Sequence, residues 1–341
     1  MRWRTVAVSV AVAGGVALFA GTLWAVDPAK LWVAIRTITP WQFGVFVALS
    51  TLNFILQVWR WDILLKAQQI HRPFGRLIEM KLSAFAITYL TPLADLMGEG
   101  VRAYLLSRER VRPSLALATA AADKLVEWIV HIGLTLVLLA AAMVGGSLPL
   151  TSPRILVVLG ALVFLFFVLG SRLVEGRGII SPFIRLLHLE RIRQLREVAK
   201  SIDRFEGVLA DYLLTKRAAV VKTVAVSAVT TLITFADVWL VLGFLGHAAT
   251  LAEVVIIQTM LVAVYATPNV AALGVGDFGG AATFQALGLG AVSGVAFTFL
   301  VRAKDLIFAG LGVLSFFGFL RVDTAMVKQM LRSWNNRDSI S

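Results

Sequence analysis

Long apolar runs separated by short polar segments dominate this chain and predict a bundle of membrane-crossing helices. A helix needs roughly 20 consecutive apolar residues to cross a bilayer, and six runs approach or exceed that length. They lie at about 6–26, 41–65, 114–145, 154–172, 218–245 and 292–320. Two further apolar runs, 77–101 and 251–290, are interrupted by proline and glycine. The pattern therefore predicts an all-α polytopic membrane protein.

The two interrupted runs carry the same motif, in which Tyr-x-Thr-Pro is followed after five residues by Gly-x-Gly. Its copies begin at Tyr89 and Tyr265. A second repeated element lies upstream, where the Thr-Leu pair at 51–52 recurs at 231–232. A duplicated unit with a broken helix in each half is typical of many secondary transporters, which bind their substrate at the breaks. The sequence therefore predicts two repeats, one at 41–145 and one at 218–320.

Lysine and arginine favour the cytoplasmic side of a membrane, and their distribution predicts opposite orientations for the two repeats. Basic residues flank 77–101 on both sides, so we expect this run to enter and leave from the cytoplasm as a re-entrant hairpin. The run 251–290 contains no lysine or arginine, which favours a second hairpin that enters from outside. Six full spans then place both termini in the cytoplasm, although Lys30 and Arg36 in the first external loop depart from the rule. An ordinary bundle in which both interrupted runs cross fully is the alternative.

The remaining segments complete a single membrane domain. We expect residues 1–40 to hold the first span and a connector, and residues 321–341 to form a basic cytoplasmic tail. Residues 146–217 are expected to hold a span and a cytoplasmic amphipathic helix, because apolar residues recur at seven-residue spacing within about 182–213.

Composition narrows the classes of function. The chain is 59% hydrophobic and 15% charged, which is too apolar for an ordinary soluble domain. It has no cysteine, which excludes disulfides, thiolate metal sites and a cysteine nucleophile. The net charge of +12 fits cytoplasmic basic residues and contact with anionic lipid rather than nucleic acid. No metal-binding, serine-hydrolase or ATP-binding motif occurs, so we expect no metal, no cofactor and no enzymatic activity.

The Thr-Pro pairs are the first candidates for a binding site. Threonine is a good N-cap and proline fits the first position of a helix, so each pair is expected to begin one. A helix N-terminus inside the membrane offers free N–H groups and a partial positive charge to an anion. Glycines nearby would allow close approach of the backbone. These candidates are Thr91, Pro92, Gly98, Thr267, Pro268 and Gly274.

Charged residues within apolar runs are the second signal, because inserting each costs about 2.5–3.5 kcal/mol. They occur at matched depths in the two repeats, which predicts a shared polar cavity. These candidates are Glu99, Arg102, Asp123, Lys124, Glu127, Asp277, Arg302, Lys304 and Asp305. Glu99 and Asp277 are also candidates for binding a coupling proton or cation. The alternative is internal pairing of Lys124 with Glu127, and of Lys304 with a neighbouring acid, which is compatible with a cavity.

These motifs resemble the flippase-like family typified by the transmembrane region of lysylphosphatidylglycerol synthases. The resemblance rests on residues 91–106 with the helix that contains Asp123-Lys-Leu, on residues 267–277, and on Arg302. Family members commonly have Pro-Gly-Gly-x-Gly-Val-Arg-Glu at the second motif, where this chain has Asn269-Val270 and Gly276-Asp277. The resemblance implies the lipid-translocating portion, without the soluble aminoacyl-transferase domain. Similar stand-alone members are associated with moving phospholipids, polyprenyl-linked lipids or hopanoids across bacterial inner membranes.

The sequence thus predicts a transporter that flips an amphiphile with an anionic, phosphate-bearing headgroup across the bacterial inner membrane. A coupling ion, a homo-oligomer and a synthase partner are left open. A non-transporting scaffold that docks a synthase through residues 180–213 is a second class. An intramembrane enzyme acting on lipid is a third, with Asp123, Glu127 and His131 as acid–base groups. The Gly-x-Gly-Asp string ending at Asp277 matches intramembrane aspartyl proteases, but the duplication explains its glycines.

Overall fold

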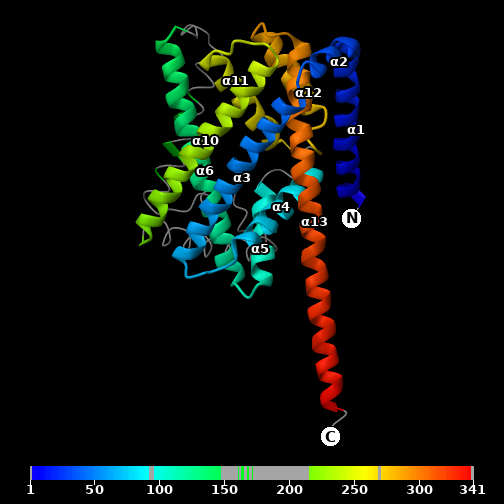
Figure 1. Ribbon diagram of the computed structural model, residues 1–341, viewed down its shortest axis with the longest axis vertical. Coiled ribbons are helices and arrows are strands. Elements are labelled where there is room, and N and C mark those ends of the chain that lie inside the picture. Colours follow the sequence, from blue (N-terminus) through cyan, green and yellow to red (C-terminus); the bar gives the residue numbers. More distant parts are fainter. Residues whose placement is uncertain are drawn as a thin grey trace.

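The computed structural model describes residues 2–91, 96–146, 215–267 and 270–338, together with single positions between 160 and 171. Every element with bounds in these ranges is a helix, which confirms the all-α prediction (Figure 1). The helices are α1 (Arg2–Ala25), α2 (Pro28–Arg36), α3 (Pro40–Ala67), α4 (Phe74–Leu90), α5 (Leu96–Arg108), α6 (Pro113–Val144), α10 (Arg217–Phe244), α11 (Leu251–Ala266), α12 (Val275–Ala286) and α13 (Ala291–Asp338). The expected span at 154–172 falls mostly outside the described residues, and the expected helix at 182–213 falls wholly outside them.

Three of these helices, α3, α6 and α10, are long and apolar enough to cross a membrane. The pair formed by α1 and α2 passes the same test when the two are taken together, although it bends by 86° between them. The described residues therefore contain three or four membrane-capable helices, as expected for a multi-pass membrane protein. Six full spans stay a prediction.

Local sequence explains where several helices begin. Thr39 and Thr250 each accept a hydrogen bond from the third residue of the next helix, and the side chain of that residue, Gln42 or Glu253, returns to the threonine N–H. This reciprocal capping box satisfies N–H groups that the first helical turn leaves free. It fixes the starts of α3 and α11.

Helices α3 and α10 pack side by side and run antiparallel (Figure 1). Ser50 donates to Asp237 at 3.0 Å, and Asn53 donates to Thr234 at 3.1 Å. Further along α3, Arg60 donates to Ser227 at 3.2 Å. Residue numbers rise along α3 as they fall along α10, so these bonds define one antiparallel register.

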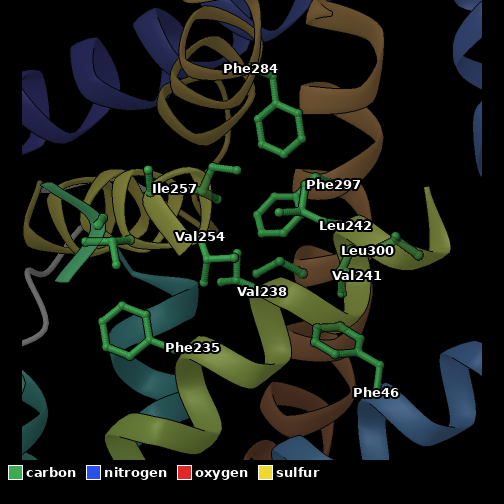
Figure 2. Close-up of a cluster of buried hydrophobic side chains, with 14 of the residues drawn as sticks. Phe46, Phe235, Val238, Val241, Leu242, Val254, Ile257, Phe284, Phe297 and Leu300 are labelled. Carbon is green, nitrogen blue, oxygen red and sulfur yellow. The ribbon is translucent and has the colours of Figure 1, made fainter. Parts of the chain in front are cut away.

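The largest apolar core joins α3, α6, α10, α11, α12 and α13. Figure 2 shows side chains of this core, among them Phe284 and Phe297, whose ring centroids lie 5.3 Å apart. A second core surrounds the fully buried Trp61 and Leu77, between α3, α4, α5 and the start of α6. The polar residues described below lie between these apolar clusters.

Glycines allow close helix contacts around α13. A Cβ on Gly294 would lie 2.2 Å from the carbonyl oxygen of Gly280 in α12, and one on Gly312 would lie 2.1 Å from that of Leu82 in α4. Small residues at helix crossings are common in membranes, where close backbone packing drives association. Helix α13 thereby contacts a broken segment from each predicted repeat, α4 and α12.

Exposed tryptophans mark the corner formed by α1, α2 and the start of α3. Trp24, Trp32 and Trp41 are 90%, 56% and 79% exposed. Tryptophan concentrates at membrane–water interfaces, and α2 turns sharply away from α1. We therefore expect α2 to lie along the membrane surface, as interfacial helices do.

Labelling can test this placement of α2, because the chain has no native cysteine. We expect a spin label on Val33→Cys in α2 to report headgroup depth in lipid vesicles. The same label on Leu52→Cys, in the middle of α3, should report the acyl-chain region; both side chains are exposed, at 64% and 48%. Equal oxygen accessibility and equal depth at the two positions would show that α2 is not interfacial.

Candidate functional site

The first polar cluster lies where α3, α5 and α6 meet. Asp123 of α6 accepts from two guanidinium groups, one on each of its oxygens. Arg60 Nε lies 2.6 Å from Oδ1, and Arg102 Nη1 lies 2.8 Å from Oδ2. All three side chains are at most 3% exposed. Such a buried carboxylate is stable only because it is paired and hydrogen-bonded.

Two more acids complete the first polar cluster. Glu127, one turn after Asp123, accepts from Arg60 and lies 3.2 Å from Lys124 Nζ. Glu99 accepts from Arg102, whose guanidinium also lies over the Trp61 ring. The predicted pairing of Lys124 with Glu127 is confirmed.

Lys81 of α4 is a member of this cluster that the sequence analysis missed. It lies in electrostatic range of two arginines and two acids at the centre of the cluster, which are Arg60, Arg102, Asp123 and Glu127. It is partly buried, and within the part of the chain that the structure describes its ammonium makes no direct hydrogen bond or ion pair. Among the described residues, the first polar cluster then has four cations and three carboxylates. These residues together carry one positive charge in excess when every group is ionised.

The second polar cluster surrounds the break between α11 and α12. Ala271, Ala272 and Gly274 all have positive φ, at 52°, 53° and 76°. Arg302 of α13 donates to the carbonyls of Ala271 and Ala272, at 3.2 Å each. The arginine thus satisfies backbone groups that an unwound segment leaves without helical partners.

Asp277 holds the same break from the side of α12. Its carboxylate accepts from Arg302 at 2.6 Å and from the Gly274 N–H at 2.9 Å. Gly274 is needed here, since a Cβ would lie 2.2 Å from the carbonyl oxygen of Gly15 in α1 and would also be strained at this φ. Asp277 therefore anchors the start of α12.

Tyr265, Lys304 and Asp305 complete the second polar cluster. The Tyr265 hydroxyl donates a hydrogen bond to Asp305, and Lys304 Nζ lies 3.2 Å from the same carboxylate. This confirms that Lys304 pairs with a neighbouring acid. Tyr89, Tyr265, Arg302 and Asp305 help to line a small pocket with room for about one water molecule. A lipid headgroup cannot enter it in this conformation.

The end of α4, just before the first Thr-Pro pair, contacts the second break. The Ala271 N–H, in the second break, donates to the Tyr89 carbonyl at 2.8 Å, and the Tyr89 hydroxyl lies 3.4 Å from the Ala271 carbonyl. Tyr89 is the second-to-last residue of α4, which ends at Leu90. The end of α4 is therefore hydrogen-bonded to the unwound segment between α11 and α12.

The expectation that a Thr-Pro pair begins a helix is wrong for Thr267-Pro268. Thr267 ends α11 with an extended ψ of 140°, and the next helix begins only at Val275, after Gly274. A residue that precedes proline is pushed out of the helical region. Thr91 likewise ends α4, with a ψ of 153°. Residues 92–95 and Pro268 lie outside the described residues, so a helix start at Thr91-Pro92 stays a prediction.

The structure distributes the candidate residues over the two clusters. Glu99, Arg102, Asp123, Lys124 and Glu127 lie in the first, and Asp277, Arg302, Lys304 and Asp305 lie in the second. Gly98 is buried close to the α4 side chain of Thr88. His131 stacks on Phe235 at 5.8 Å.

These broken helices and buried ion pairs define a polytopic membrane protein with polar chemistry in its interior. The chain matches the family described as "Lysylphosphatidylglycerol synthase TM region" over residues 6–334, and it belongs to that family. The resemblance seen in the motifs is thereby confirmed. A "UPF0104 membrane protein" from Methanothermobacter thermautotrophicus is 33% identical over 111 residues, which cover 32% of this chain and 33% of that relative. No solved structure matches the chain.

Proposed function

We propose that this protein is a lipid transporter of the bacterial inner membrane, with both termini in the cytoplasm. It moves an amphiphile with an anionic, phosphate-bearing headgroup between leaflets. The observation that carries the proposal is the contact between the end of α4 and the break before α12, where Arg302 binds the unwound backbone. A buried charge cluster that contains Arg102 and Lys81 adds to it. Irregular backbone at membrane depth persists where protein or a polar cavity shelters it, and transporters use such breaks to bind substrate.

The pairing of α3 with α10 supports an inverted repeat. The Thr-Leu pair at 51–52 in α3 recurs 180 positions later at 231–232 in α10. The two helices run antiparallel, so the equivalent helices of the two repeats have opposite directions. In this proposal α3–α6 and α10–α13 are the two repeats, and α4–α5 and α11–α12 are their re-entrant hairpins.

The charge of the first polar cluster favours an anionic ligand. Its single positive excess would be neutralised by a phosphodiester, which carries one negative charge. Lys81 is the cation of this cluster without a direct partner among the described residues, so we propose that it contacts the headgroup phosphate. The bundle must open to admit a headgroup, because the pocket beside Arg302 has room for about one water molecule.

The contacts of the acids favour transport over catalysis. Asp123 and Glu127 are bound to Arg60, and His131 stacks on Phe235, so these three residues are engaged within the protein. Asp277 is held by Arg302, whereas Asp237 bonds to Ser50, so the two do not form the shared pair that an aspartyl protease needs. We propose that the chain is not an enzyme.

A proteoliposome assay tests this function. We expect the purified protein to accelerate the exchange of a fluorescent anionic phospholipid between leaflets. Lys81→Gln should lower that rate about tenfold or more, because a hydrogen bond to a charged group contributes about 1.5–3 kcal/mol. Lys30→Gln, which changes a side chain that is 72% exposed, should leave the rate unchanged.

The outcomes of this assay separate two claims. If the wild-type protein accelerates no anionic lipid, the proposal of transport is wrong. If transport occurs but Lys81→Gln matches the wild type, Lys81 is not part of the headgroup site. A cationic lipid moved as fast as an anionic one would contradict the charge argument.

A further inference from the structure

Asp237 of α10 is a buried carboxylate, and one of its oxygens has no hydrogen-bond donor among the described residues. Ser50 donates to Oδ2 at 3.0 Å, while Oδ1 is buried and makes no hydrogen bond. The residue is only 9% exposed. A buried acceptor without a donor costs about 1–3 kcal/mol, and more if it is charged. Asp237 therefore needs a donor that the described residues do not supply in this conformation.

The groups around Asp237 include one cation. Lys304 of α13 is in electrostatic range, but its ammonium pairs with Asp305 at 3.2 Å and lies 5.3 Å from the centre of the Phe46 ring. Helix α3 contributes Ser50 to Asp237. Helix α6 contributes His131, which stacks on Phe235 two residues earlier in α10.

Helix α11, which also packs on α10, brings no charge to Asp237. Its acid Glu253 lies in the first turn, where its carboxylate caps the Thr250 N–H. Within the described chain, Lys304 is thus the charged group that acts on Asp237.

Arg60 of α3 shows how a buried charge at the contact between α3 and α10 is otherwise satisfied. Like Asp237, it bonds to a serine of the opposite helix. Arg60, however, also binds two carboxylates of α6, Asp123 and Glu127. Asp237 has no such ion pair among the described residues, although Lys304 is near.

The acids first considered for ion coupling are held by arginines. Glu99 accepts from Arg102, and Asp277 accepts from Arg302. Each of these acids has an ion-pair partner, which Asp237 lacks among the described residues. No group of three or more acids and histidines among the described residues could hold a metal ion. A proton, by contrast, needs only one free carboxylate oxygen.

We propose that Asp237 is the proton-binding group that couples lipid movement to a proton gradient. In the conformation described here its carboxylate takes up one proton on Oδ1 and becomes a neutral carboxyl group. When α13 moves so that Lys304 leaves Asp305 and pairs with Asp237, the carboxyl releases that proton. This inference rests on the proposed function, since it names the energy source of the same transporter.

Infrared spectroscopy tests proton binding without any transport. In the wild-type protein, a titration from acid to base should remove the C=O stretching band of a protonated, buried carboxyl group. Asp237→Asn should lack that band, since asparagine keeps the shape and the acceptor for Ser50 but cannot titrate. Asp27→Asn, a matched change at a side chain that is 48% exposed, should retain the band. A band of equal size in Asp237→Asn would overturn the inference.

Transport in proteoliposomes tests coupling. We expect an imposed pH gradient to change the wild-type rate of labelled anionic lipid movement severalfold. Asp237→Asn should still equilibrate lipid between leaflets but should not respond to the gradient. Wild-type transport that ignores the gradient would overturn the inference and leave the proposed function standing. Absence of any transport would reject the proposed function, while the infrared band would still decide whether Asp237 binds a proton.

Discussion

Replacing Arg60 with leucine is expected to lower the free energy of unfolding by about 3–5 kcal/mol, the usual cost of removing one partner of a buried ion pair. Arg60 is fully buried and binds both Asp123 and Glu127. Its loss leaves two carboxylates with fewer donors in an apolar surrounding. The arginine also bonds to Ser227, so the contact between α3 and α10 is weakened as well. Unfolding in detergent micelles, followed by circular dichroism, measures the change.

A matched control separates burial from loss of charge. Lys30→Leu also removes a cation from an ion pair, but the Lys30 side chain is 72% exposed and its partner Asp27 is 48% exposed. Exposed pairs contribute about 0–1 kcal/mol, so this variant should unfold close to the wild type. Equal stability of the Arg60 and Lys30 variants would show that the first polar cluster does not depend on Arg60.

Gly312→Ala is expected to cost about 1–3 kcal/mol, the usual penalty for overfilling a packed contact. The added Cβ would lie 2.1 Å from the Leu82 carbonyl oxygen and 2.7 Å from the Ala86 Cβ, both in α4. A backbone atom cannot rotate away as a side chain can, so α13 and α4 must separate. Because Lys81 is next to Leu82 in α4, the separation should also disturb the first polar cluster.

Gly310→Ala is the matched control on the same helix. A Cβ at that position meets nothing within 4 Å. Alanine is a better helix former than glycine by about 1 kcal/mol, so this variant should be as stable as the wild type or more stable. Thermal unfolding of both variants in one detergent compares them directly. Similar melting temperatures would mean that α4 and α13 are not in close contact in the protein.

The spacing of apolar residues and the positions of proline and glycine predicted most helices of the described chain, but not α2 or the continuation of α13 beyond residue 320. The apolar runs of α3, α6 and α10 and the breaks after Leu90 and Ala266 were read from the sequence. They could be read because each depends on neighbouring residues only. The Thr267-Pro268 pair was expected to start a helix but follows the end of one, since threonine before proline can stop a helix as well as start one. The extended backbone that proline imposes on Thr267 ends α11 there.

The polar sites were only partly predictable. Charges within apolar runs singled out Asp123, Glu127 and Arg302, because isolated charge is unusual in a membrane helix. Arg60 and Lys81 were not among the candidates, although both are cations inside or beside apolar runs. Their roles depend on the crossing of helices far apart in the chain, such as Arg60 with Asp123, and no local pattern reveals that.

The left-handed backbone at Ala271 and Ala272 has a mechanical consequence. Each alanine in that conformation costs roughly 1–2 kcal/mol, so this segment stores backbone strain. Arg302 keeps the segment strained, because it donates hydrogen bonds to both carbonyls at 3.2 Å. An anion that binds the guanidinium more strongly would free these carbonyls, and the backbone would relax. That movement would reach Tyr89 through its hydrogen bond to Ala271.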